Sequence, residues 1–152
     1  MPKVVVPSRG SGELVLVVDD EAATLQMVEA VLRSRGYRVL TARGGAEALE
    51  LYDRNRPEIR AVLLDMMMPD MDGLAVMSRF RERDPDIRII GSSGLQVTRR
   101  AAEMLSANRA AFLPKPYSDG QLLAALTEIL QRPNPAYGDR RPSPAHVTGE
   151  NQ

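Results

Sequence analysis

Short apolar runs alternate with stretches of helical periodicity along this chain, and no other feature constrains its fold more. The first run, Leu14–Val18, contains only Leu and Val, is too short for a helix and predicts a strand buried on both faces. The next apolar residues recur at spacings of three and four up to Gly36, which predicts an amphipathic helix. Four more strand–helix units follow this one.

The four further units complete an α/β pattern. Strands are predicted at residues 37–41, 61–65, 87–91 and 111–113, and helices at 46–55, 73–83, 96–106 and up to Leu130, the last with Ser118 and Gln121 at capping-box spacing. Five such units in about 120 residues predict a doubly wound sheet of five parallel strands, with five helices on its two faces. A closed eight-fold barrel needs about twice this length.

One domain accounts for the foldable part of the 152 residues. Residues 1–13 hold two prolines and two glycines among polar residues, so we expect a flexible lead-in there. Residues 132–152 contain four more prolines and few apolar side chains, so we expect a disordered, proline-rich tail. The domain itself then spans residues 14–131.

Composition excludes several classes of protein. The 20 basic side chains balance 20 acidic ones, so the broad positive surface of a nucleic-acid binder is not expected. With no cysteine, the chain cannot form disulfides, thiolate zinc sites or a cysteine nucleophile. The longest aliphatic run, Leu14–Val18, is far shorter than the roughly 20 residues that cross a bilayer. We therefore expect no membrane segment, a cytoplasmic location, and proteins or small molecules as partners.

Polar side chains follow four of the predicted strands. They are Asp19-Asp20 after the first strand, Asp65 at the end of the third, Ser92-Ser93 after the fourth and Lys115 after the fifth. In an open parallel sheet the ligand site lies beyond the carboxyl ends of the strands, so these side chains should converge. Converging carboxylates repel each other unless a cation lies among them, and oxygen ligands alone favour a hard ion such as Mg²⁺.

This constellation points to phosphoryl transfer. A carboxylate can act as the nucleophile and become an aspartyl phosphate. The transition state needs mainly positioning and charge stabilisation, in which a lysine supplies a point charge and a hydroxyl donates a hydrogen bond. Lys115 and Ser93 suit these two roles.

The same residues resemble the receiver domain of two-component response regulators, of the chemotaxis-regulator type. The matching pieces are VVDDE at 17–21, LLDMMMP at 63–69 running into MDG at 71–73, SSG at 92–94 and FLPKP at 112–116. Their order makes the set specific, as do the separations of 45, 28 and 22 residues from Asp20 through Asp65 and Ser93 to Lys115. The resemblance covers residues 14–131 and implies a flavodoxin-like fold with strand order 2-1-3-4-5.

The resemblance also implies a role for each matched residue. Asp65 would be the phosphoacceptor, Ser93 the switch hydroxyl, and Lys115 the phosphate contact, in a Lys115–Pro116 cis peptide. A Mg²⁺ ion would be held by three carboxylates and one backbone carbonyl: Asp20 and Asp65 directly, Asp19 through water, and Met67 by its carbonyl. The protein would be a signalling domain rather than an enzyme, and would catalyse only its own phosphorylation and dephosphorylation.

The implied signalling route runs from Asp65 to a distant face. A histidine kinase or phosphotransfer protein would supply the phosphoryl group, Ser93 and Lys115 would move toward it, and Phe112, at the switch aromatic position, would turn inward. This would reshape a face formed by helix 96–106, strand 111–113 and the last helix, which offers a contact surface for a partner or a second copy of the chain. The residues assigned to this face are Val97, Arg100, Ala101, Met104 and Leu105.

Two other functions stay open, and so does the question whether the chain is a free-standing protein or part of a larger one. A pseudo-receiver would keep the fold and act through protein contacts alone. A phosphatase of the haloacid-dehalogenase type would use the D-x-D-G sequence at 70–73, although Pro69 precedes it and Asp65 already ends the strand. The sequence SRGSGE at 8–13 resembles the link before the receiver of hybrid histidine kinases, so the chain fits either a free-standing regulator or a piece of such a kinase. In either setting, bulky Met67 and Leu95, two residues past Asp65 and Ser93, should slow hydrolysis of the phosphorylated residue.

Overall fold

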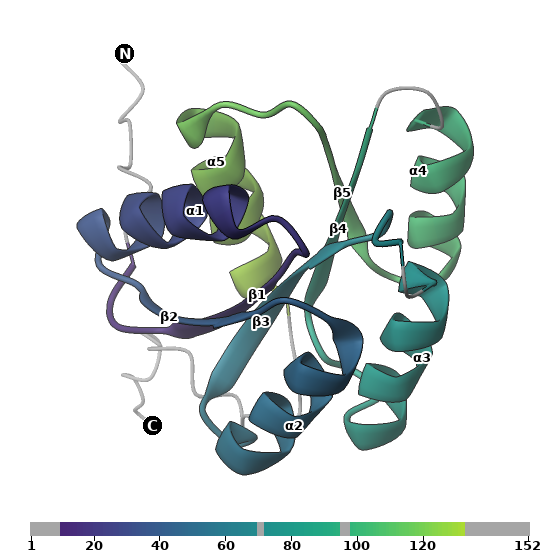
Figure 1. Cartoon of the computed structure of the whole chain (residues 1–152), viewed down its shortest axis with the longest axis horizontal. Helices are drawn as coiled ribbons and strands as arrows, with labels where there is room; N and C mark the ends of the chain where they lie inside the picture. The colour runs from purple at the N-terminus through teal and green to yellow at the C-terminus, as the bar shows by residue number, and fades with distance from the viewer. Residues whose placement is uncertain (1–9, 70–71, 95–97, 133–152) are drawn as a thin grey trace, which may run out of the picture.

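The computed structural model describes residues 10–69, 72–94 and 98–132, which form one sheet with helices on both sides (Figure 1). The strands are β1 (Leu14–Val18), β2 (Arg38–Ala42), β3 (Ile59–Asp65), β4 (Ile89–Ser93) and β5 (Ala111–Pro114). The helices are α1 (Ala22–Ser34), α2 (Gly45–Asn55), α3 (Gly73–Arg83), α4 (Thr98–Ala107) and α5 (Asp119–Leu130). Every predicted strand and helix is present.

The strands form a parallel sheet in the order β2-β1-β3-β4-β5. Both the predicted doubly wound α/β architecture and the strand order implied by the resemblance are confirmed. The chain moves outward from β1 to β2 on one side and to β3, β4 and β5 on the other. Strand order therefore reverses at β1 and β3, and a ligand crevice is expected beyond their carboxyl ends.

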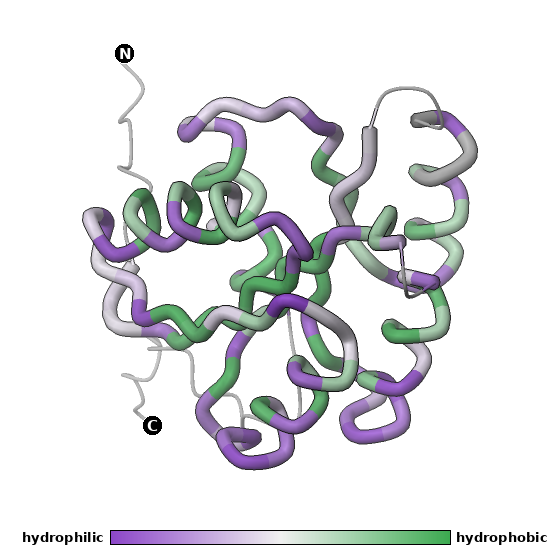
Figure 2. The backbone as a smooth tube through the Cα atoms, viewed as in Figure 1, coloured by the Kyte–Doolittle hydropathy of each residue, from purple (hydrophilic) through white to green (hydrophobic). Residues whose placement is uncertain are grey.

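Two hydrophobic clusters lie on opposite faces of the sheet. Because successive residues of a strand point to opposite sides, Leu16 and Val18 share one cluster with residues of α2, α3 and α4, whereas Val15 and Val17 share the other with residues of α1 and α5. Figure 2 shows the hydrophobic colour concentrated in the central strands. Burial on both faces explains why β1 is apolar at every position.

The fourth strand lies two residues beyond its predicted position. The apolar run predicted a strand at 87–91, but β4 ends at Ser93, because the backbone of Ser92 pairs with Asp65 and that of Ser93 with Pro114. Ile87 instead follows the turn at residues 85–86, and its N–H donates to the carbonyl of Asp84. Hydropathy does not report backbone pairing, so the polar residues Ser92 and Ser93 fall outside the strand that the apolar run predicts. The other boundaries agree with the predictions to within two residues.

Side-chain hydrogen bonds cap the first turns of two helices, α5 and α3. In the predicted capping box of α5, Ser118 Oγ accepts from the N–H of Gln121 at 3.1 Å, and Gln121 Oε1 accepts from the N–H of Ser118 at 2.8 Å. At the start of α3, the carboxylate of Asp72 accepts from the N–H of Leu74 at 3.1 Å.

Residues 10–13, the described part of the predicted lead-in, pack against the turn between α1 and β2. The N–H of Gly10 donates to the carbonyl of Arg35 at 2.6 Å, and the N–H of Gly12 donates to the carbonyl of Gly36 at 2.7 Å. The N–H of Arg38 donates to the carbonyl of Glu13 at 2.9 Å. These four residues thus lie on the domain surface rather than apart from it. Residues 1–9 and 133–152 lie outside the described part of the chain.

Candidate functional site

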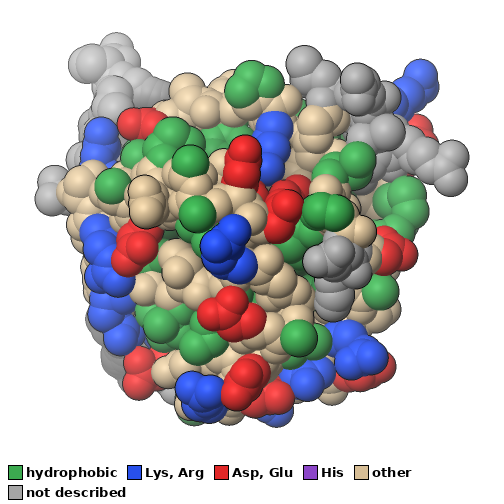
Figure 3. All heavy atoms as spheres, in the orientation of Figure 1, with side chains coloured by type: hydrophobic (Ala, Val, Ile, Leu, Met, Phe, Trp, Pro, Cys, Tyr) green, Lys and Arg blue, Asp and Glu red, His purple; other side chains and the backbone are tan. Residues whose placement is uncertain are grey.

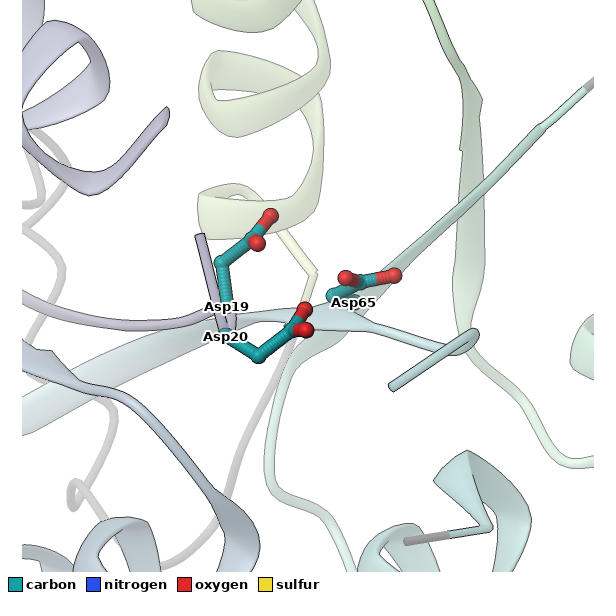
Figure 4. A group of neighbouring side chains, drawn as sticks. All are labelled: Asp19, Asp20 and Asp65. Atoms are coloured by element: carbon teal, nitrogen blue, oxygen red, sulfur yellow. The ribbon is translucent and has the colours of Figure 1, made fainter. Parts of the chain in front are cut away.

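Three carboxylates meet where β1 and β3 end. Asp19 and Asp20 directly follow β1, and Asp65 is the last residue of β3. The two strands are parallel neighbours, with Val18 paired to Leu64, so their ends reach the same edge of the sheet. One oxygen from each carboxylate lies within 4.8 Å of the other two (Figure 4). The structure thus brings together the three carboxylates that the strand-end rule predicted would converge.

Local hydrogen bonds orient the two buried carboxylates. Oδ1 of Asp19 accepts from the N–H of Glu21 at 2.9 Å, and Oδ1 of Asp65 accepts from the N–H of Met67 at 2.9 Å. An aspartate that bonds the backbone two residues further along is typical of a turn. This arrangement leaves Oδ2 of each carboxylate for a partner from elsewhere in the fold.

Lys115 supplies that partner from the end of β5. Its Nζ lies 3.0 Å from Oδ2 of Asp19 and 3.5 Å from Oδ2 of Asp65. The N–H of Lys115 donates to the carbonyl of Ser93 at 2.8 Å, which joins the ends of β4 and β5, and the Lys115–Pro116 peptide bond is cis as expected. One ammonium among three carboxylates leaves the cluster with a net negative charge.

Burial and neighbouring charges shift the pKa values of this site. Burial raises the pKa of Asp65 above its ordinary value, and the hydrogen bond from Met67 and the charge of Lys115 offset this only in part. Burial lowers the pKa of Lys115, but the hydrogen bond to Asp19 and the charges of Asp65 and Asp19 outweigh it, so the pKa is raised overall. Lys115 therefore stays protonated at neutral pH, beside a carboxylate whose charge is poorly solvated.

Two buried serines end β4 next to this cluster. Ser92 pairs with Asp65 in the sheet, and Ser93 is the next residue. In the described part of the chain neither hydroxyl has a hydrogen-bond partner. A buried hydroxyl without a partner costs about 1–3 kcal/mol. Because consecutive strand residues point to opposite faces of the sheet, the two hydroxyls do not share one site, and Ser93 is the one at the predicted switch position.

The donor set suits a hard divalent cation. The cluster consists of carboxylates alone, and their mutual repulsion is relieved when a cation lies among them. Mg²⁺ prefers oxygen ligands and binds through one or two carboxylates while keeping several waters. The residues present therefore fit the predicted ion.

Two further predicted site residues, Phe112 and Met67, lie in or just after the strands that carry the site. Phe112 in β5 is half-buried and packs against the cluster that contains α2, α3 and α4. Met67 is 58% exposed, and its backbone N–H is the one that Asp65 accepts. Its side chain is thus free to influence access to Asp65 from solvent.

The predicted contact face is wrong at Leu105. This side chain is 1% exposed and covers Gly91 of β4, where an added Cβ would lie 2.6 Å from a Leu105 methyl carbon. Helical spacing identified an apolar face of α4 but did not distinguish residues that face the sheet from residues that face solvent. Met104 is half-buried, Val97 lies outside the described residues, and the side chains of Arg100 and Ala101 are not described.

Sequence reasoning missed Arg43 and Tyr117. Arg43 follows β2, and its Nη2 donates to the backbone carbonyl of Asp20 at 3.1 Å. Extending the strand-end rule to the second strand would have found it. Tyr117 follows the cis proline, and burial raises the pKa of its hydroxyl, which also senses the charges of Lys115 and Asp19.

The phosphatase-like sequence at 70–73 is only partly described. Asp70 and Met71 lie outside the described residues, as does Leu95, whereas the carboxylate of Asp72 caps α3. Among the described helices, none combines the length and apolar character needed to cross a membrane.

Comparison with curated proteins gives a consistent match. A family model described as the response regulator receiver domain matches residues 15–127, which include the carboxylate cluster and Lys115. Response regulator MprA of Mycobacterium sp. (strain KMS) is 36% identical over 129 residues, which are 85% of this chain and 55% of that protein. Sensor kinase CckA of Brucella abortus (strain 2308) is 37% identical over 123 residues, which are 81% of this chain and 13% of that protein. The chain thus spans about half the length of the response regulators it matches.

Solved structures agree with this match. The CheX-CheY-BeF3-Mg+2 complex from Borrelia burgdorferi contains a similar chain, with a TM-score of 0.73, 30% identity, and coverage of 78% of this chain and 90% of that one. Vibrio cholerae chemotaxis protein CheY4 has a TM-score of 0.71 at 28% identity, with coverage of 78% and 98%. Sequence, strand order and the acidic edge of the sheet therefore agree that this chain belongs to the receiver-domain family of two-component response regulators.

Proposed function

We propose that this receiver domain accepts a phosphoryl group on Asp65 from a histidine kinase or a phosphotransfer protein. The main support is the position of Lys115, whose Nζ lies 3.5 Å from Oδ2 of Asp65 at the edge where three carboxylates meet. An Asp65 oxygen would form a bond to phosphorus while the bond from phosphorus to the donor's imidazole nitrogen breaks, and the imidazole would keep the electron pair. The domain would thus catalyse its own phosphorylation and, with water as the attacking group, its own dephosphorylation.

Asp19, Asp20, Asp65 and the backbone carbonyl of Met67 would hold a Mg²⁺ ion. The oxygen-only donors and the net negative charge of the cluster support this assignment. When bound, the ion would neutralise charge on the phosphoryl oxygens. Lys115 would contribute a second positive charge, and its bond to Asp19 would keep it aimed at the site.

Ser93 and Phe112 would connect phosphorylation to the surface. The Ser93 hydroxyl, which has no partner among the described residues, would donate to a phosphoryl oxygen. Because Lys115 N–H bonds the Ser93 carbonyl, the ends of β4 and β5 would move together, and Phe112 in β5 would turn inward. The face of α4, β5 and α5, which includes Met104, would then bind a partner protein or a second copy of the chain.

Labelling with a small phosphoryl donor tests this proposal. Wild-type protein incubated with acetyl phosphate and Mg²⁺ is expected to gain one phosphoryl group by intact mass, and Asp65→Asn is expected to gain none. Asp84→Asn is the matched control, because it removes another buried carboxylate outside the cluster and should leave labelling intact. Removal of Mg²⁺ with a chelator should abolish labelling.

Three outcomes would contradict the proposal. No label on wild-type protein would indicate a pseudo-receiver that acts through contacts alone. Equal labelling of Asp65→Asn would place the phosphoacceptor elsewhere. Repeated turnover of a phosphate monoester would indicate a phosphatase. We also propose that the reaction takes place in the cytoplasm.

A further inference from the structure

Arg43 brings a positive charge close to the acidic site. Its side chain is exposed, and its Nη2 donates to the backbone carbonyl of Asp20 at 3.1 Å. Within one aspartate, the carbonyl oxygen and the carboxylate lie no more than about 5 Å apart. The guanidinium nitrogen therefore lies within roughly 8 Å of the Asp20 carboxylate.

Arg43 is held at both its backbone and its side chain. Its N–H donates to Oε1 of Glu47, in the first turn of α2, at 2.9 Å, while the side chain is bound to Asp20. A guanidinium has five N–H donors, and the hydrogen bonds of the described residues use one of them. The side chain is thus oriented by the fold yet keeps donors for another acceptor.

An incoming phosphoryl donor is an anion, and the three carboxylates that it approaches are balanced only when both Lys115 and a divalent cation are present. Lys115 is the ammonium within the cluster, and it already pairs with Asp19 and Asp65. A second cation at the edge of the site would lower the electrostatic cost of the approach. Arginine suits this purpose, because its planar fork matches the oxygens of a phosphoryl group.

We propose that Arg43 binds the phosphoryl group of the donor before transfer, and so sets the preference of this domain for anionic phosphoryl donors. This inference rests on the proposed phosphorylation of Asp65. Arg43 would bind the donor before transfer, whereas Lys115 would stabilise negative charge during the transfer itself.

The rate of labelling by acetyl phosphate at different salt concentrations tests this inference. Arg43→Gln is expected to lower the second-order rate constant about fivefold at low salt, the size of a Coulomb interaction between a dianion and an exposed charge. The difference should disappear near 1 M salt, where the screening length is about 3 Å. Arg43→Lys should retain part of the wild-type rate, because lysine keeps the charge but lacks the planar fork. Arg54→Gln is the matched control: Arg54 pairs with Glu50 in the last turns of α2, and its loss should leave the rate unchanged.

Mg²⁺ titration distinguishes donor binding from a purely structural clamp on Asp20. If Arg43 acts by charge, Arg43→Gln should bind Mg²⁺ about twofold more tightly, because a repelling cation has been removed. Weaker Mg²⁺ binding, or a rate defect that persists at high salt, would overturn the inference in favour of a clamp. Equal rates for wild-type and Arg43→Gln would overturn the inference alone, whereas an unlabelled wild-type protein would overturn the proposed function and this inference together.

Discussion

Asp65 combines reactivity with a cost in stability. Burial raises the pKa of Asp65 in the folded state, so folding favours the protonated side chain. The stability that this contributes is fully present below pH 3.8, the ordinary pKa, and is lost as the pH rises through the folded-state pKa. At neutral pH the ionised carboxylate therefore opposes folding. The same poor solvation leaves its oxygens available to a nucleophilic role.

Asp65→Asn should consequently be more stable than wild type at pH 7, since the amide carries no charge to bury. The gain should shrink as the pH falls through the raised folded-state pKa towards 3.8, and it should be absent well below 3.8, where the carboxyl is protonated in both states. Urea unfolding at the two pH values measures the difference. A gain of the same size at both would show that the charge is not its cause.

Ser93 should matter for the response to phosphorylation more than for stability. Ser93→Ala removes a buried hydroxyl that has no partner among the described residues, so the free energy of unfolding should stay the same or rise by about 1 kcal/mol. The phosphorylation-dependent change in amide exchange of β5 should be lost. Ser92→Ala is the control, because it removes an equally buried hydroxyl outside the switch position and should preserve that change. A β5 response in Ser93→Ala equal to wild type would refute this role.

Met67 should protect the phosphorylated aspartate from water. Its exposed side chain lies two residues past Asp65, so Met67→Asn is expected to speed phosphoryl loss severalfold by admitting and orienting water. Decay of the labelled mass after donor removal measures this. Met27→Asn replaces another exposed methionine, in α1, and should leave the decay rate unchanged. An unaltered rate in Met67→Asn would count against the prediction.

At the scale of elements, the segment before β1, residues 10–13, packs closely against the turn after α1 through contacts of glycine residues. Gly36 has a φ of +93°, and an added Cβ there would lie 2.5 Å from the carbonyl oxygen of Gly10. A Cβ on Gly10 would in turn lie 2.6 Å from the ring of Tyr37, a buried residue of the cluster beneath α1 and α5. Residues 10–13 are thus fitted to this turn.

Gly36→Ala should destabilise the domain by at least about 1 kcal/mol, because alanine is strained at this φ and its Cβ would displace the backbone of Gly10. Chemical denaturation gives the value. Gly120→Ala, in the first turn of α5, meets only an ordinary contact and should stabilise by roughly 0.5–1 kcal/mol through helix propensity. Similar effects of both substitutions would argue against the close fit at Gly36.

On the scale of the whole molecule, the acidic site is built from the ends of three strands of the sheet. Asp19 and Asp20 extend β1, Asp65 ends β3, and Lys115 follows β5, so the site exists only when the sheet is assembled. Acidic and basic side chains are interspersed over the face in Figure 3, in keeping with the balanced charge of the chain. The negative character of the cluster is therefore local.

Because the unfolded chain lacks this cluster, Mg²⁺ should stabilise the whole domain. At 100 times its dissociation constant the ion would add about 2.7 kcal/mol to the free energy of unfolding. Thermal unfolding with increasing Mg²⁺ should show this as a rising midpoint in wild type and a much smaller rise in Asp20→Asn. A midpoint that responds identically in the two proteins would place the ion elsewhere.

The order of elements, the two-sided burial of the sheet and the convergence of Asp19, Asp20 and Asp65 followed from the sequence. These properties depend on local periodicity and on a general rule for the ends of parallel strands, so side-chain type alone reveals them. The cis peptide before Pro116 and the strand order came from resemblance to a family, and the structure has both.

Only the tertiary structure decided the end of β4, the burial of Leu105, the packing of residues 10–13 and the bond from Arg43 to Asp20. Each depends on contacts between segments far apart in the chain, or on backbone pairing that is independent of side-chain hydropathy. Such contacts leave no periodic trace in the sequence, and they are determined when the sheet and its helices pack together.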